Sequence, residues 1–153
     1  MKIKQFLYEP YHYFYHLNKK EVMTAIKKIL EQVGMDEACL GKYPHELSGG
    51  QLQRISIARA LIIQPQLLIC DEITSSLDQV IQRDIIELLK QCVYKYHMAI
   101  LFVSHDLSLV HKFCHQVLVL NDGKIIEKGT IQQLYKSKNE VVQNLLKAAY
   151  LNG

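Results

Sequence analysis

The spacing of apolar residues predicts helical structure over the first part of the chain. From Met1 to about Leu40, apolar positions recur at helical intervals between lysines and glutamates, after an aromatic start. Gly34 is expected to end this helical segment, because helices often close on a glycine in the left-handed conformation. Another helix is expected to begin at Ser48, since Ser48 and Gln51 have the spacing of a capping box.

Farther along, short apolar runs alternate with helical patterns. The pattern predicts strands at 66–70, 98–103 and 116–120 and helices at 78–94, 107–114 and 140–150. The first of these strands is unbroken in its apolar character, so it is expected to be buried on both faces. Asn121-Asp122-Gly123 predicts a hairpin turn into a strand at 124–127, and Thr130 with Gln133 predicts a capped helix. This alternation is typical of an α/β fold with a mostly parallel sheet.

Composition narrows the class of protein. The 153 residues suffice for one domain, and a net charge of +3 from scattered Lys and Arg argues against a nucleic-acid partner. No apolar run has the length of a membrane span, and the amino terminus lacks a signal-peptide pattern. The four cysteines form no C-x-x-C pair, which is typical of a reducing compartment. We therefore expect a cytoplasmic protein.

Three polar motifs stand beside apolar elements. Ser48-Gly49-Gly50 opens a helix, and the N–H groups at such a helix start form an anion site. Asp71-Glu72 follows an apolar strand, where ligands bind in α/β sheets, and adjacent carboxylates can serve a metal and a nucleophile. Ser104-His105-Asp106 follows the next strand. Together they predict one phosphate-handling site.

A phosphate-cradling loop is missing from this sequence. Such a loop needs Gly, four residues, and then Gly-Lys-Ser/Thr. Glycine precedes lysine only at Gly41-Lys42 and Gly123-Lys124. Neither pair has the upstream glycine, and Tyr43 and Ile125 stand where Ser or Thr belongs.

The run from Tyr43 to Gln51, with the strand-end carboxylates and histidine, resembles the ATP-binding subunits of ABC transporters, most closely the dipeptide, oligopeptide and nickel importers. The resemblance covers nearly the whole chain but only the later part of a family member. It implies an α/β fold that is an incomplete ABC-type P-loop ATPase domain. Residues 1–64 would form a helical subdomain with the signature motif, and residues 65–153 the carboxy-terminal part of the RecA-like core.

The resemblance also implies roles for individual residues. Asp71 would hold Mg²⁺, Glu72 would act on the water that attacks the γ-phosphate of ATP, and His105 would contact that phosphate. The signature residues Ser48, Gly49, Gly50 and Gln51 would close over ATP held on a partner subunit. Asp78 would lie at the interface between the two subunits. The cofactors implied are ATP and Mg²⁺.

The partners implied are a second ABC ATPase subunit and transmembrane permease subunits, which would place the chain on the inner face of the cell membrane. Two positions depart from the family pattern: Ile73 stands where proline is usual and Ser76 where alanine is common. Losing that proline frees the backbone after Glu72.

Plainer interpretations stand beside these. Asp71-Glu72 could be a surface turn, Ser48-Gly49-Gly50 an ordinary helix cap, and His105 a plain polar residue. His111, Cys114 and His115 have spacing compatible with metal ligands, but no fourth ligand is obvious. The aromatic stretch from Tyr8 to Tyr15, with His12 and His16, is interpreted as packing or a partner-contact surface.

Three functions stay open at this point. The chain could be an ATP-hydrolysing subunit of a peptide or nickel importer that an amino-terminal piece completes. It could be a non-catalytic module that lends its signature to a partner, or an inactive remnant. A chromosome-structure ATPase is disfavoured by the Tyr-Pro-His-Glu lead-in and the absence of long heptads. Without a phosphate loop, the isolated chain is expected to bind ATP weakly or not at all.

Overall fold

The computed structural model describes residues 1–151, which form two compact units. Among the described residues, unit 1 comprises 1–69 and 73–101, and unit 2 comprises 70–72 and 102–151. Two strands, β1 (Leu67–Asp71) and β2 (Ala99–Val103), pair as a two-stranded sheet, and each contributes residues to both units. The N–H of Ala99 donates to the Gln66 carbonyl and that of Glu72 to the Val103 carbonyl, so the strands run parallel.

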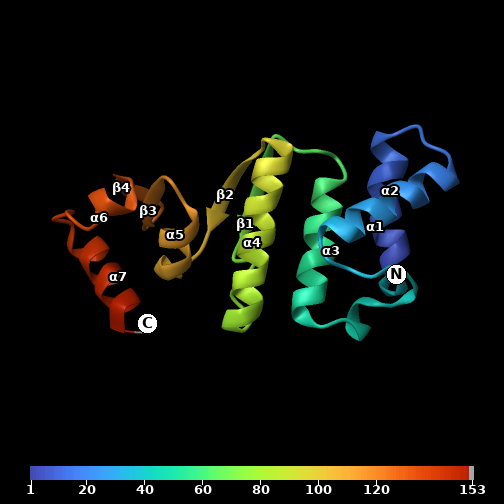
Figure 1. Ribbon diagram of the computed structural model, residues 1–153. Helices are drawn as coiled ribbons and strands as arrows, with labels where there is room; N and C mark the ends of the chain where they lie inside the picture. The colour runs from blue at the N-terminus through green and yellow to red at the C-terminus, as the bar shows by residue number, and fades with distance from the viewer. Residues whose placement is uncertain (152–153) are drawn as a thin grey trace. The chain divides into compact units, whose positions relative to one another are not determined.

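The rest of unit 1 is helical (Figure 1). Its helices are α1 (Ile3–Phe14), α2 (Lys19–Gln32), the short 3₁₀ helices η1 (Glu37–Gly41) and η2 (Pro44–Glu46), α3 (Gly49–Leu61) and α4 (Gln79–Tyr96). The sequence predicted one helical segment up to Leu40, and this was wrong in one respect: the helical structure is interrupted between α1 and α2. The break has a local cause, because the Asn18 side chain accepts the N–H groups of Lys20 and Glu21 and so starts a new helix.

Gly34 ends α2 as predicted. Its φ is +66°, in the left-handed region where a side chain is strained. The N–H of Met35 reaches the Leu30 carbonyl at 2.9 Å, and that of Gly34 reaches the Glu31 carbonyl at 3.1 Å, which is the Schellman arrangement. Arg54 Nη1 donates to the remaining Val33 carbonyl at 2.8 Å, so the α2 end is also tied to α3.

A second arginine of α3 joins that helix to α1. Pro10 lies inside α1 and has no N–H, so the Phe6 carbonyl loses its helical partner. Arg59 Nη1 donates to that carbonyl instead, and Arg59 Nη2 pairs with Glu9 Oε2 at 2.7 Å. The guanidinium carbon lies 4.2 Å from the centre of the Phe6 ring. The Arg59 side chain therefore donates to the Phe6 carbonyl that Pro10 leaves without a helical partner, forms an ion pair with Glu9 and packs on the Phe6 ring.

The prediction that the first strand is buried on both faces was wrong. In β1, Leu68 and Cys70 are buried, whereas Leu67 and Ile69 are 52% and 62% exposed. On β2, Leu101 is 47% exposed. Alternate residues of a strand point to opposite faces, so only one face of this sheet is covered by described residues.

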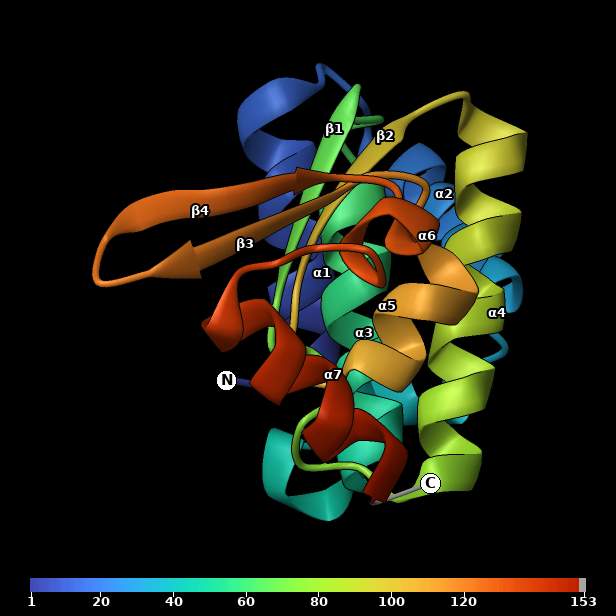
Figure 2. The ribbon, with the colours of Figure 1, turned by 90° about the vertical axis from the view of Figure 1, so that its left-hand side faces the viewer.

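Unit 2 contains an antiparallel hairpin followed and preceded by helices (Figure 2). These are α5 (Leu107–Phe113), β3 (Val117–Asn121), β4 (Lys124–Gly129), α6 (Ile131–Leu134) and α7 (Glu140–Leu151). The predicted turn is confirmed: Asp122 and Gly123 both have positive φ, as a type I′ turn requires. The core of this unit joins α5, the hairpin, α6 and α7 through Val110, Val117, Val119, Leu134, Val142 and Leu146.

The α/β class is therefore confirmed, and the four described strands form two separate sheets, one parallel and one antiparallel. The capping boxes predicted at Ser48–Gln51 and Thr130–Gln133 are both present. The predicted division between residues 64 and 65 concerns subdomains of the ABC family rather than these units, and it stays a prediction. None of the helices among residues 1–151 has the length and apolar character needed to cross a membrane.

Candidate functional site

Glu72 occupies an unusual backbone position directly after β1. Its φ is +49°, in the left-handed region that non-glycine residues rarely adopt. Its N–H donates to the Val103 carbonyl at 3.0 Å, at the end of β2. A backbone strained in this way persists only where its surroundings hold it, and such residues gather at functional sites.

His105 meets this carboxylate. Its Nδ1 lies 2.9 Å from Glu72 Oε1, and the two side chains are 76% and 40% exposed. The hydrogen bond to Glu72, reinforced by the attraction of that carboxylate, raises the pKa of His105 above 6.5. The pair therefore favours an imidazolium beside a carboxylate, in a position open to solvent.

The turn that carries His105 is fixed by its neighbours. Ser104 Oγ accepts the Asp106 N–H at 3.0 Å, and the Asp106 carboxylate caps α5 by accepting from the N–H groups of Ser108 and Leu109. Partial burial works to raise the pKa of Asp106, but these hydrogen bonds outweigh it and the pKa is lowered. Asp106 therefore stays ionised as a cap beside His105.

Asp71 ends β1 and is exposed. Among residues 1–151 no group of three or more His, Cys, Asp or Glu side chains is placed to hold a metal ion. A single carboxylate at a strand end still fits Mg²⁺, which proteins commonly bind through one or two carboxylates together with substrate phosphates.

In unit 1 the signature turn forms a reciprocal capping box. Ser48 Oγ accepts the Gln51 N–H at 3.3 Å, and Gln51 Oε1 accepts the Ser48 N–H at 3.0 Å. Gly50 is buried, and a Cβ on it would lie 2.7 Å from Cγ2 of Ile81. A Cβ on Gly49 would lie 3.3 Å from Cδ2 of Leu77. Both glycines thus allow close packing of this turn.

Asp78 lies between those two contacts in sequence. Its carboxylate caps α4 by accepting from the N–H groups of Val80 and Ile81, both at 3.0 Å. The preceding turn is held by Thr74, whose carbonyl accepts the Leu77 N–H and, at 2.9 Å, Nε2 of Gln82. The signature turn and the Asp78 turn are therefore packed together within unit 1.

The structure thus brings the predicted residues together in two sets. Glu72 and His105 are in contact in unit 2, where Asp71 is the residue before Glu72, and Ser48 to Gln51 pack beside the Asp78 turn in unit 1. Their roles toward a nucleotide stay predictions. Sequence reasoning missed the contributions of Val103 and Gln82. The role of the Val103 carbonyl leaves no signal in the sequence, because any residue has a carbonyl group. The role of Gln82 could be predicted only if the direction of the Thr74 carbonyl toward α4 were already known.

The structure also places the possible metal ligands near His111 and the aromatic stretch from Tyr8 to Tyr15. The His111 ring packs edge-on against Tyr135, with ring centres 6.2 Å apart, and burial raises the pKa of the Cys114 thiol. In the aromatic stretch, Tyr11 is buried, while Tyr13 and Phe14 are exposed. This segment therefore both packs and presents surface, and its role in partner contact stays a prediction.

Comparison with known proteins supports the resemblance. The family described as ABC transporter matches residues 3–75. The nickel import ATP-binding protein NikE of Escherichia coli strain K12 is 38% identical over 151 residues, covering 97% of this chain and 56% of NikE. The oligopeptide transport ATP-binding protein OppF of Mycoplasma genitalium is 39% identical over 137 residues, covering 89% of this chain and 16% of OppF.

Solved structures agree. A dimeric structure of a bacterial ABC transporter cassette superimposes with a TM-score of 0.75 at 26% identity, covering 86% of this chain and 57% of that one. The same cassette in a post-hydrolysis state with ADP and phosphate gives a TM-score of 0.73. The chain therefore spans about half the length of the nickel-import relatives it matches. Over most of its length it resembles the ATP-binding subunits of ABC importers and has the fold of part of an ABC-type ATPase cassette.

Proposed function

We propose that this chain belongs to the ABC transporter ATPases and forms part of a subunit that hydrolyses ATP to drive import of peptides or nickel. The observation that carries the proposal is the 2.9 Å contact between His105 Nδ1 and Glu72 Oε1 at the ends of two paired strands. A carboxylate and an imidazole in contact are suited to water activation and phosphate contact respectively.

In this proposal Glu72 accepts a proton from the water that attacks the γ-phosphate. His105 donates from Nδ1 to Glu72 and so orients the carboxylate, while Nε2 is directed to a phosphate oxygen. The raised pKa of His105 favours the imidazolium, which places a positive charge near the phosphate where negative charge accumulates. Asp71 would be the carboxylate that holds Mg²⁺, which supplies further charge neutralisation when bound.

The signature turn would act on a nucleotide bound elsewhere. Ser48, Gly49, Gly50 and Gln51 form the amino-terminal end of a 13-residue helix, where free N–H groups and the helix dipole favour an anion. Asp78 would face the second ATPase subunit from its packed turn. Permease subunits would hold the assembly at the inner face of the membrane.

One observation favours a second candidate. The signature turn is held by the Ser48–Gln51 capping box and packed within unit 1, while the sequence contains no phosphate loop. The chain could therefore lend its signature to an intact partner without hydrolysing ATP itself. Ser48→Arg would abolish any effect on such a partner's turnover, because the larger charged side chain would fill the anion site.

The two candidates are separated by co-expression with a segment that carries a phosphate loop. ATP hydrolysis is expected to appear and to be lost in Glu72→Gln, which keeps the shape but not the base. Glu87→Gln is the matched control, because Glu87 is exposed on α4 and pairs with Lys90 of the same helix at 3.6 Å. Hydrolysis that survives Glu72→Gln would contradict the catalytic proposal.

A further inference from the structure

The turn from Thr74 to Asp78 is held at its start by a side chain of the helix that follows it. The Thr74 carbonyl accepts two hydrogen bonds, from the Leu77 N–H at 3.1 Å and from Nε2 of Gln82 at 2.9 Å. A carbonyl oxygen has two lone pairs, so both are used here. Thr74 is 3% exposed, and buried backbone groups need such partners.

Gln82 also fixes the other end of this turn. Its backbone N–H donates to the Asp78 carbonyl at 2.9 Å, four residues back, while its side chain reaches the Thr74 carbonyl, eight residues back. The Asp78 carboxylate in turn accepts the N–H groups of Val80 and Ile81. One residue of α4 therefore binds both the first and the last residue of the turn.

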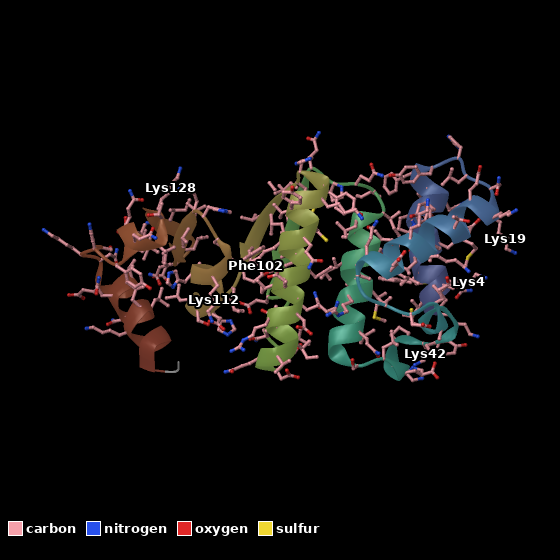
Figure 3. All side chains as sticks on the ribbon, viewed as in Figure 1. Lys4, Lys19, Lys42, Phe102, Lys112 and Lys128 are labelled. Atoms are coloured by element: carbon pink, nitrogen blue, oxygen red, sulfur yellow. The ribbon has the colours of Figure 1, made fainter. Side chains whose placement is uncertain are left out.

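The segment that Gln82 holds lies against the signature turn. Cδ2 of Leu77, inside the held turn, would lie 3.3 Å from a Cβ on Gly49, and Cγ2 of Ile81 would lie 2.7 Å from a Cβ on Gly50. The helices α3 and α4 are neighbours, and their side chains occupy the space between them (Figure 3). Because glycine has no side chain that could adjust, a shift of Leu77 or Ile81 acts directly on the backbone of the signature turn.

We propose that Gln82 is a positioning residue for the signature turn. By holding the Thr74 carbonyl it fixes the two side chains that contact the signature glycines, and therefore the direction in which the N–H groups of this helix start face a phosphate. The inference rests on the proposed function, because both candidates use the signature turn to bind a phosphate.

The first test needs no nucleotide. Gln82→Met keeps the length of the side chain and removes its donor, and the amide NMR signals of Gly49 and Gly50 in the whole chain are expected to shift. Exchange of the Leu77 N–H with solvent should become at least about fivefold faster, since its turn is held less firmly. Gln91→Met is the matched control, because Gln91 is exposed on the same helix. Unchanged signals of both glycines in Gln82→Met would overturn the proposal.

Gln82→Glu tests the hydrogen bond within a single protein. A carboxylate has no hydrogen to donate, whereas a protonated carboxyl group can donate to the Thr74 carbonyl. The signals of Gly49 and Gly50 should therefore differ from those of the wild type at neutral pH and return toward them as the pH falls to about 4. Gln82→Met should show no such return. If the two variants respond to pH in the same way, the hydrogen bond does not set the signature turn and the proposal is wrong.

ATP hydrolysis separates this inference from the proposed function. In the complex with a segment that carries a phosphate loop, Gln82→Met should lower kcat at least about fivefold, at a temperature well below its thermal midpoint, while Gln91→Met keeps the wild-type rate. An unchanged kcat in Gln82→Met, with hydrolysis still lost in Glu72→Gln, would overturn the positioning role and leave the catalytic proposal standing. If the wild-type complex does not hydrolyse ATP, the catalytic proposal fails, and the signals of Gly49 and Gly50 still decide whether Gln82 positions the signature turn.

Discussion

Gly50 of the signature turn packs directly against Ile81 of α4, and a Cβ on Gly50 would lie 2.7 Å from Cγ2 of that isoleucine. Ile81 belongs to the first turn of α4, and its N–H is bound by the Asp78 carboxylate. The missing side chain at position 50 is therefore required by the chain's own packing. A loss of activity on substituting Gly50 would mix this packing effect with any loss of phosphate contact.

Gly50→Ala is expected to lower the free energy of unfolding by about 1–3 kcal/mol, the usual cost of overpacking. Chemical denaturation of the wild type and of Gly50→Ala measures this loss. Gly41→Ala is the control, since nothing lies within 4 Å of a Cβ at Gly41. Ile81→Ala should restore part of the stability lost in Gly50→Ala. If the two single losses of unfolding free energy simply add in the double variant, the contact between position 50 and Ile81 is not the cause of the loss in Gly50→Ala.

Local rules predicted the parts of the fold that short segments determine. The capping boxes at Ser48 and Thr130 and the type I′ turn at Gly123 each depend on residues within three positions of one another. The contact between Glu72 and His105 also follows, because adjacent parallel strands bring their carboxyl ends together. Residue types and their spacing are therefore enough to predict these features.

Long-range packing was beyond the sequence pattern. An apolar run looks the same whether one or both faces of a strand are covered, so the exposure of Ile69 could not be predicted. The fit of Gly50 to Ile81 joins residues 31 positions apart and leaves no periodic signal. The left-handed backbone of Glu72 runs against the usual preference of glutamate, so propensity pointed elsewhere.

Arg59 should contribute more to the free energy of unfolding because Pro10 is present. Arg59→Ala is expected to cost about 1–2 kcal/mol of unfolding free energy, since it leaves the Phe6 carbonyl unpaired and removes a partly exposed ion pair with Glu9. Pro10→Ala restores an N–H that can bond that carbonyl within the helix. Removing Arg59 should therefore cost less in the Pro10→Ala protein. A double-mutant cycle with no coupling between the two positions would contradict this account.

The pH behaviour of His105 should depend on Glu72. Because the contact raises the pKa of His105 above 6.5, the attraction is fully present below about pH 6.5 and is lost as the pH rises through the raised value. In Glu72→Gln the pKa of His105 is expected to fall, as measured by NMR titration of the imidazole. Glu87→Gln should leave it unchanged. An identical titration curve for His105 in the wild type and Glu72→Gln would show that the contact does not form in solution.

The isolated chain should bind MgATP weakly or not at all. Backbone N–H groups of a phosphate loop normally surround the phosphates, and this sequence has no such loop. The carboxylates of Asp71 and Glu72 would also repel the phosphates when no metal or loop offsets their charge. Isothermal titration of the purified chain tests this expectation, and micromolar affinity for MgATP would contradict it.

Replacing Glu72 should separate backbone strain from side-chain function. Its φ of +49° suits glycine and disfavours any residue with a Cβ. Glu72→Gly and Glu72→Ala both remove the carboxylate that contacts His105, but only glycine relieves the backbone. We therefore expect Glu72→Gly to be more stable than Glu72→Ala by about 1 kcal/mol in chemical denaturation, with the greater flexibility of glycine in the unfolded chain reducing the difference. Both variants should lack hydrolysis when a phosphate loop is supplied. A glycine variant less stable than the alanine variant would mean that Glu72 is not held in the left-handed conformation in solution.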